Sequence, residues 1–250
     1  MPEYFYKSSF LYDRGIFLEA IPLMSTLSVI ELETAENPQF TVIWLHGLGA
    51  NANDFVPVIP ELKLAADMPV RFVFPNAPEI PVTINGGYVM PAWYDILEMS
   101  ADHRKVDQAG IQRSVDQIRQ LIVREHQRGI DASHIFLAGF SQGGAIAYQA
   151  ALSHEQRLGG VIALSTYIPD AQALKTQFNT VQQQLPVFIA HGQYDGVVPL
   201  QMGASACAVA QQLGCSVNWQ EYAMEHQVCL EEIHAIGDWL VTQFKQIKNL

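Results

Sequence analysis

The sequence has few charged side chains and an excess of acidic ones, which narrows the choice of partners. Charged residues make up 16% of its 250 residues, and 25 Asp and Glu outnumber 14 Lys and Arg to give a formal net charge of -11. An acidic surface repels phosphate backbones and anionic lipid head groups, so neither nucleic acid nor a membrane surface is an expected partner. A neutral small molecule is the simplest expected substrate.

Cysteines are scarce, and long apolar runs are absent. The count of three cysteines is odd and their spacing matches no zinc site, so idle thiols in a reducing compartment are expected and we predict a cytoplasmic protein. No run of about 18 apolar residues occurs, so no membrane span is predicted. The first residues also lack the order of basic, apolar and small residues that is typical of a secretion signal.

Short apolar runs alternate with helical periods along the chain. The runs predict seven strands: Leu27–Leu32, Thr41–Leu45, Val70–Phe74, Ile135–Ala138, Val161–Leu164, Val187–Ala190 and Ser216–Tyr222. Several are continuously apolar and rich in Val, Ile and Phe, which is typical of parallel strands covered on both faces. Apolar residues spaced by three and four predict helices over Ile111–Ile122, Met202–Leu213 and Ile233–Ile247, with Gly214 as a cap. The sequence therefore predicts an α/β fold, a mostly parallel sheet flanked by helices in a three-layer sandwich.

The length suits a single domain, which we place at residues 24–250. Residues 1–23 form an N-terminal extension of uncertain status, and a start at Met24 is an alternative that the sequence leaves open. Asn76–Tyr94, rich in Pro and Gly, is predicted to be a long loop, and loops of this length are usually functional or mobile.

The sharpest chemical signal is Gly139-Phe140-Ser141-Gln142-Gly143-Gly144. It follows a predicted strand and precedes a helical segment, which is the context of a nucleophile elbow. The glycines let neighbouring backbone pass close to the serine, and the helix N-terminus favours developing negative charge. The alternative is a chance Gly-x-Ser-x-Gly in an ordinary turn. We predict Ser141 as a nucleophile.

A serine nucleophile needs a base and an orienting acid, and hydrolases of this kind carry them in the order Ser, acid, His. Asp195 lies just beyond the strand Val187–Ala190, and Asp170, in what looks like a plain turn, is the weaker rival. His226 follows the strand Ser216–Tyr222, whereas His234 falls inside the last predicted helix. We predict Asp195 as the acid and His226 as the base. His46 and His191, each before a glycine, are expected to be structural.

Acyl transfer also needs N–H groups that bind the oxyanion. The backbone N–H of Gln142, directly after the serine, is the first candidate. The second is expected in the loop after an early strand, and His46-Gly47-Leu48-Gly49 follows Thr41–Leu45. We predict Leu48 as this donor; the alternative is a tight glycine turn.

Substrate contacts are predicted from the loop that leaves the sheet beside the serine. Its apolar side chains are suited to covering an acyl chain, and we predict that they contact the substrate: Ile80, Val82, Ile84 and Trp93. The alternative, weighed equally, is that these residues only pack on the body of the protein.

Taken together, these segments resemble the phospholipase/carboxylesterase family, which includes bacterial carboxylesterases and eukaryotic acyl-protein thioesterases. The resemblance rests on segments in family order from about residue 27 to the C-terminus: His46-Gly47-Leu48-Gly49, Pro75-Asn76-Ala77-Pro78, Ala92-Trp93-Tyr94-Asp95, Gly139–Gly144, His191-Gly192 with Asp195, Val198 and Pro199, and Tyr222, Met224 and His226. Two departures stand out. Glu225 replaces a glycine that is frequent before the histidine, and residues 1–23 have no counterpart.

The resemblance implies hydrolysis of carboxylic esters or thioesters without a cofactor. The expected activity is a serine carboxylesterase that acts on short- to medium-chain esters, with a small-molecule substrate; a homodimer is compatible with it. An acyl-protein thioesterase or lysophospholipase would use the same residues. A ligand-binding protein without activity should lack a catalytic residue, and none of the three is missing. A metal-dependent hydrolase is disfavoured because no His-x-x-x-His or acidic cluster occurs.

Overall fold

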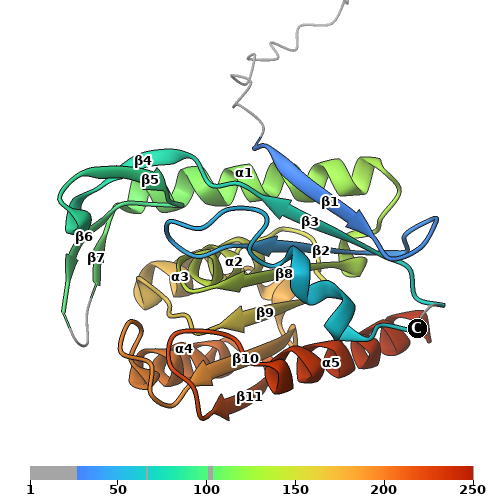
Figure 1. The fold of residues 1–250 in the computed structure, drawn as a ribbon. Coiled ribbons are helices and arrows are strands. Elements are labelled where there is room, and N and C mark those ends of the chain that lie inside the picture. The colour runs from blue at the N-terminus through green and yellow to red at the C-terminus, as the bar shows by residue number, and fades with distance from the viewer. Residues whose placement is uncertain (1–26, 66, 101–103, 250) are drawn as a thin grey trace, which may run out of the picture.

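The computed structural model describes residues 27–65, 67–100 and 104–249, so the predicted N-terminal extension lies outside it. A twisted seven-stranded sheet forms the centre (Figure 1), and all its strands are parallel except β1, which pairs antiparallel with β3 at one edge. In spatial order the strands are β1 (Val29–Glu33), β3 (Val70–Pro75), β2 (Phe40–Leu45), β8 (Ile135–Phe140), β9 (Gly160–Leu164), β10 (Pro186–Gly192) and β11 (Ser216–Tyr222). Each matches a predicted strand, with small shifts at the ends.

Helices cover both faces of this sheet, so the predicted three-layer α/β architecture is confirmed (Figure 1). One face carries α1 (Gln108–Gln127), α2 (Gln142–Leu152), α3 (Ala171–Gln177) and α4 (Leu200–Gln212). The other face carries α5 (Leu230–Lys248) and the 3-10 helix η1 (Val56–Leu62). Gly214 follows the end of α4 with φ of 84°, as its predicted capping role requires. No helix in the described part of the chain is both long and apolar enough to cross a membrane.

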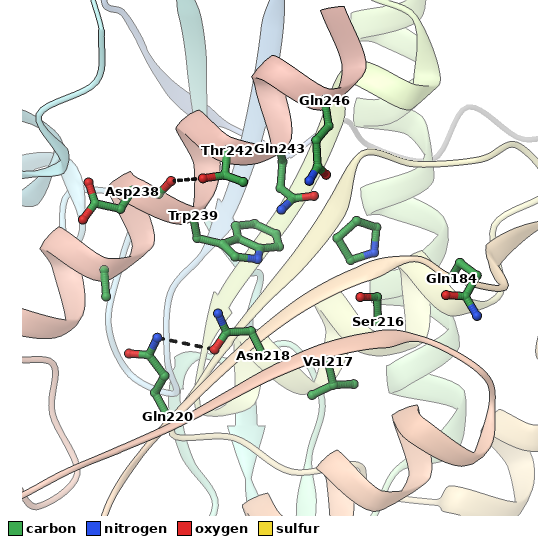
Figure 2. Close-up of a pocket in the computed structure, with 12 residues that line it drawn as sticks. Gln184, Ser216, Val217, Asn218, Gln220, Asp238, Trp239, Thr242, Gln243 and Gln246 are labelled. Atoms are coloured by element: carbon green, nitrogen blue, oxygen red, sulfur yellow. Dashed lines mark hydrogen bonds between the residues drawn. The ribbon is translucent and has the colours of Figure 1, made fainter. Parts of the chain in front are cut away.

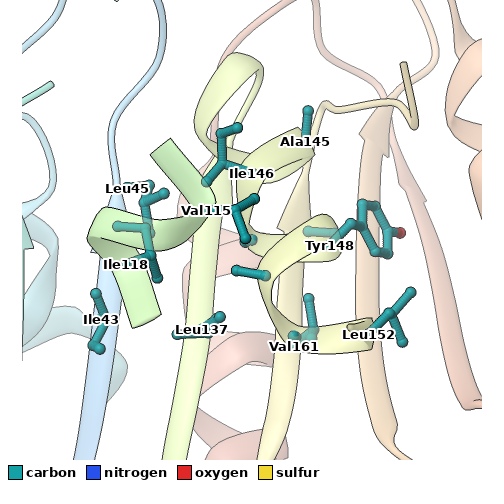
Figure 3. Close-up of a cluster of buried hydrophobic side chains, with 14 of the residues drawn as sticks. Ile43, Leu45, Val115, Ile118, Leu137, Ala145, Ile146, Tyr148, Leu152 and Val161 are labelled. Carbon is teal, nitrogen blue, oxygen red and sulfur yellow. The ribbon is translucent and has the colours of Figure 1, made fainter. Parts of the chain in front are cut away.

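Strand β2 shows how the two cores form. It is buried at every residue, and because side chains alternate between the faces, Ile43 and Leu45 join the core under α1 and α2 while Val42 and Trp44 join the core under α5. Figure 3 shows the first core, where α1 and α2 pack on β2, β8 and β9. Each large aliphatic side chain buried there contributes about 1.5–3 kcal/mol. This packing fixes α2, and with it the turn that precedes it.

The structure differs from the prediction in the segment Asn76–Tyr94. It is not an open loop: β4 (Glu79–Val82) and β5 (Tyr88–Pro91) pair antiparallel across the short 3-10 helix η2 (Thr83–Asn85) and two glycines with positive φ. Prolines in both strands hide the alternation typical of a hairpin. A second hairpin that the sequence did not predict follows it, made by β6 (Ile96–Met99) and β7 (Arg104–Val106).

Candidate active site

The carboxyl ends of three parallel strands bring the predicted serine, acid and base together. Ser141 lies between β8 and α2, Asp195 follows β10, and His226 follows β11. Strands β8 to β11 are neighbours in the sheet, so the segments that leave them meet at one edge. Ser141 has φ of 52° and ψ of -120°, a backbone conformation that non-glycine residues rarely adopt, and it projects its side chain from the turn.

The three side chains form one hydrogen-bonded chain. Nε2 of His226 lies 3.0 Å from Oγ of Ser141, and Nδ1 of His226 lies 2.7 Å from Oδ2 of Asp195. The other oxygen of Asp195 accepts the N–H groups of Val197 and Val198 at 2.8 and 2.7 Å. Burial acts to raise the pKa of Asp195, but the hydrogen bonds from His226 and these backbone groups outweigh it and hold the pKa below its usual range. Asp195 is therefore ionised and fixed in orientation at neutral pH.

The rival acid Asp170, the rival base His234 and the histidine expected to be structural, His191, have other contacts. Asp170 is the N-cap of α3 and accepts the N–H of Ala173 at 2.8 Å. His234 lies within α5, 3.5 Å from a carboxylate oxygen of Glu61. His191 is fully buried, and its Nε2 lies 2.8 Å from the carbonyl oxygen of Val198, so it braces the loop that holds Asp195. None of these three contacts involves Ser141.

Glycine at position 143 is required by the approach of α2 to strand β2. A Cβ on Gly143 would lie 2.5 Å from the carbonyl oxygen of His46 and 2.6 Å from that of Leu45, closer than any side chain tolerates. The first residues of α2 therefore rest directly on the end of β2. This contact also places the loop after β2 beside Ser141.

Both predicted oxyanion donors lie at the pocket beside Ser141. Within the described residues, the backbone N–H groups of Leu48 and Gln142 have no hydrogen-bond partner. The Leu48 loop is pinned by His46, whose Nε2 accepts the N–H of Ala77 at 3.0 Å while Nδ1 donates to the carbonyl oxygen of Gly47 at 2.7 Å. Burial lowers the pKa of His46, which keeps the ring neutral as these contacts require. The geometry therefore leaves two fixed donors free.

The predicted substrate contacts separate in the structure. Ile84 lines the Ser141 pocket, whereas Val82 and Trp93 are buried and Ile80 lines a different pocket next to α1. Trp93 has a structural place: its Nε1 donates to the carbonyl oxygen of His46 at 2.8 Å. Ile80, Val82 and Trp93 thus do not line the Ser141 pocket, because the hairpin and the residues after it pack on the body of the protein.

The pocket at Ser141 has a volume of about 320 Å³ and a mostly apolar wall. Its wall also contains apolar side chains that were not predicted as substrate contacts: Ile96, Met99, Phe140, Tyr167, Val197 and Val198. Arg104 and Asp54 also line it. Several of these residues belong to the second hairpin and to the acid loop, whose positions depend on tertiary packing. No local sequence signal marks them as residues of the pocket wall.

A larger pocket, of about 630 Å³, lies between α5 and the edge strand β11 (Figure 2). Its wall is made mainly of amide and hydroxyl side chains, such as Asn218 and Gln243, and its one ionisable side chain is Asp238. It contains none of the predicted site residues and no pairing of a nucleophile with a base. The hydrogen-bonded pair of Ser141 and His226 lies instead at the smaller pocket.

A mostly parallel sheet with a serine on the turn between a strand and a helix defines the α/β-hydrolase fold. Residues 26–243 match the model of the phospholipase/carboxylesterase family, and the chain belongs to this family of hydrolases. The resemblance inferred from the sequence motifs is confirmed.

Curated relatives carry a more specific name. The chain is 37% identical over 210 residues to acyl-protein thioesterase 1 of Yarrowia lipolytica, a match that covers 82% of this chain and 92% of the relative. It is 34% identical over 207 residues to acyl-protein thioesterase 1 of Saccharomyces cerevisiae, covering 80% and 91%.

Solved structures share the fold. The crystal structure of Arabidopsis thaliana SOBER1 matches with a TM-score of 0.77 at 27% identity and covers 82% of this chain and 98% of that one. The Bacillus cereus carboxylesterase matches with a TM-score of 0.70 at 18% identity, covering 87% and 94%. At 18% identity, the similarity to the Bacillus cereus carboxylesterase supports the fold alone.

Proposed function

We propose that this protein is a serine hydrolase that cleaves acyl esters and thioesters, with Ser141 as nucleophile, His226 as base and Asp195 as orienting acid. The observation that carries the proposal is the hydrogen-bonded chain from Asp195 through His226 to Oγ of Ser141, at the mouth of a mostly apolar pocket. A serine hydroxyl alone is a weak nucleophile, and such a chain is what activates it.

The geometry supports an acyl-enzyme mechanism. With the Nδ1 proton of His226 donated to Asp195, Nε2 takes the proton of Ser141 as Oγ attacks the substrate carbonyl carbon. The carbonyl oxygen becomes an oxyanion, for which the free N–H groups of Leu48 and Gln142 are the proposed donors. Protonated His226 then gives its proton to the leaving alcohol or thiol as the bond to the acyl carbon breaks. Water, activated by His226, hydrolyses the acyl-enzyme and releases the acid. Every group comes from the chain, so we propose no cofactor.

Two substrate classes are proposed for the same site. The pocket of about 320 Å³ fits short to medium acyl chains, which favours a carboxylesterase. The names of the curated relatives favour acyl thioesters as the second class. We propose that the protein acts on such small acyl compounds in the cytoplasm, and that the acyl chain contacts Leu48, Ile84, Ile96 and Phe140.

A fluorophosphonate probe tests the nucleophile. The wild-type protein should be labelled once, and Ser141→Ala should not be labelled. The matched control is Ser205→Ala, which removes an exposed hydroxyl on α4 that bonds only to the carbonyl oxygen of Gln201. Labelling that persists in Ser141→Ala would show that another residue is the nucleophile.

Matched substrates test whether the protein prefers oxygen esters or thioesters. The same acyl group, presented as an oxygen ester and as a thioester with similar leaving groups, should be hydrolysed in both forms, and the ratio of the two kcat/KM values assigns the preference. In an ester series, each added methylene should improve transition-state binding by up to about 0.8 kcal/mol until the pocket is full. A wild-type protein that hydrolyses neither bond would refute the proposed function.

A further inference from the structure

The Ser141 pocket contains a buried cation that the mechanism does not use. Arg104 is the first residue of β7, and it is only 4% exposed. It nevertheless lines the same pocket as Ser141 and His226. A guanidinium is always charged in proteins, and burying a charge is costly unless a partner compensates it.

The contacts of Arg104 do not neutralise its charge. Its Nη2 donates to the carbonyl oxygen of Val197, and the guanidinium carbon lies 5.0 Å from the centroid of the Tyr167 ring. No carboxylate among residues 27–65, 67–100 and 104–249 forms an ion pair with it. Arg71, the other arginine that is buried among the described residues, is the opposite case, since Glu33 and Glu125 pair with it at 2.8 and 2.9 Å.

The polar groups described near Arg104 do not supply the missing negative charge. The hydroxyls of Tyr94 and Tyr167 lie 2.8 Å apart, and burial raises the pKa of both, so both phenols stay protonated. Asp195 is occupied by His226 and by two backbone N–H groups. Asp54 lines the pocket but is exposed and forms no ion pair with Arg104 in the described structure. The pocket therefore has a buried positive charge with room for an anion beside it.

We propose that Arg104 binds an anionic group of the substrate, so that the preferred esters or thioesters carry a carboxylate or phosphate close to the bond that is cleaved. This inference deepens the proposed function and rests on it. The planar guanidinium has five N–H donors in a geometry that matches carboxylate and phosphate oxygens. The net charge of -11 disfavours anionic substrates at long range. Arg104 lines the pocket itself, so its positive charge acts on a bound substrate at short range.

Matched substrate pairs test this proposal. For the acyl side, 4-nitrophenyl butyrate is compared with mono-4-nitrophenyl succinate, in which a carboxylate replaces the terminal methyl of the same four-carbon acyl chain. For the leaving-group side, butyryl glycerol is compared with butyryl glycerol 3-phosphate. The wild-type protein should prefer the anionic member of at least one pair by at least about tenfold in kcat/KM. The pair that shows the preference identifies the anion and its side of the bond.

Variants of β7 separate recognition from structure. Arg104→Gln should reduce the anionic-to-neutral ratio to about one while neutral esters are still hydrolysed, and Arg104→Lys should keep part of the preference. The control Lys105→Gln removes a neighbouring charge that is 59% exposed and paired with Glu98, and it should leave the ratio unchanged. If Arg104 has only a structural role, Arg104→Gln should lower the rates for the anionic and the neutral substrate by the same factor. An unchanged ratio in Arg104→Gln, or no wild-type preference in either pair, would overturn the proposal.

A binding measurement keeps this test independent of turnover. By calorimetry, Ser141→Ala should bind the anionic member of the preferred pair at least about tenfold more tightly than its neutral partner. Adding Arg104→Gln should abolish the difference. Equal affinities in the single variant would overturn the anion site even if esters are hydrolysed. If the wild-type protein is not labelled by the fluorophosphonate or hydrolyses no substrate, but the selective binding is observed, only the proposed function is refuted.

Discussion

The side-chain amide of Gln142 joins the serine turn to the segment that contains Trp93. Its Oε1 accepts the N–H of Trp93 at 2.8 Å, and its Nε2 donates to the carbonyl oxygen of Tyr94 at 2.8 Å. Two motifs that lie about fifty residues apart in the sequence are therefore one unit in the structure. The side chain of Gln142 braces the wall of the site, while its backbone N–H is left for the proposed oxyanion.

Gln142→Ala should destabilise the protein. It leaves the N–H of Trp93 and the carbonyl of Tyr94 buried without a partner, which costs about 1–3 kcal/mol for each unpaired group. Urea denaturation measures the loss in the free energy of unfolding. The control Gln212→Ala removes an exposed amide that bonds to Lys175 and should cost far less. Equal losses in the two variants would contradict the bracing role.

Gly143→Ala should also destabilise the protein, for a steric reason. The added methyl would collide with two backbone carbonyl oxygens at the end of β2, and neither can move without shifting the sheet. Overpacking of this kind costs typically about 1–3 kcal/mol. Gly196→Ala is the control, since nothing lies within 4 Å of a Cβ there. If thermal unfolding shows Gly143→Ala to be as stable as Gly196→Ala, the close contact is wrong.

Asp195→Asn should lower kcat by about three to four orders of magnitude, because an amide donates to Nδ1 of His226 and holds the imidazole in the wrong tautomer. Asp170→Asn is the matched control. Asp170 only caps α3, and asparagine caps a helix equally well, so its turnover should stay at the wild-type level. Steady-state hydrolysis of one neutral ester measures both. A large loss in Asp170→Asn would reassign the acid.

Glu232 should make the protein less stable as the pH rises. It is fully buried in the first turn of α5, and burial raises its pKa from 4.5 to about 8. Between these two values the folded protein keeps a proton that the unfolded chain has lost. The free energy of unfolding should therefore fall with increasing pH in this window, by up to about 1.4 kcal/mol per pH unit.

Glu232→Gln should remove this pH dependence, since a neutral amide has no proton to lose and can still accept the N–H of Cys229. Denaturation curves at several pH values measure the slope. Glu231→Gln changes the exposed neighbouring carboxylate and should keep the wild-type slope. A slope that survives in Glu232→Gln would assign the pH dependence to another group.

The sequence predicted the sheet and the meeting of the three side chains, because both depend on local signals. The strand β11 was predicted with the bounds Ser216–Tyr222 that the structure has. Ser141, Asp195 and His226 each lie within a few residues of the end of a strand, and parallel strands place such positions at one edge. Their chemical roles stay predictions until the variants are measured.

The pocket wall was less predictable, because it depends on long-range packing. The hairpin of β4 and β5 is hidden by prolines, so apolar residues such as Val82 looked like free loop contacts although they are buried. Arg104 shows the same limit. Nothing in its local sequence distinguishes it from an exposed arginine, and only the position of β7 beside the acid loop places it at the site.

The depth of α2 in the core has a consequence for how different parts of the site fluctuate. All of α2 is buried, so its amides should exchange with solvent only in the rarest openings of the molecule. The hairpin that carries Arg104 is a separate two-stranded sheet, and three of the four residues of β6 are exposed. It should open far more often. Ser141 thus precedes a helix in which substitutions disturb the core, whereas Arg104 lies on a hairpin with an exposed strand that accepts substitutions more readily. New substrate preferences can therefore arise in the hairpin while the reacting serine stays in place.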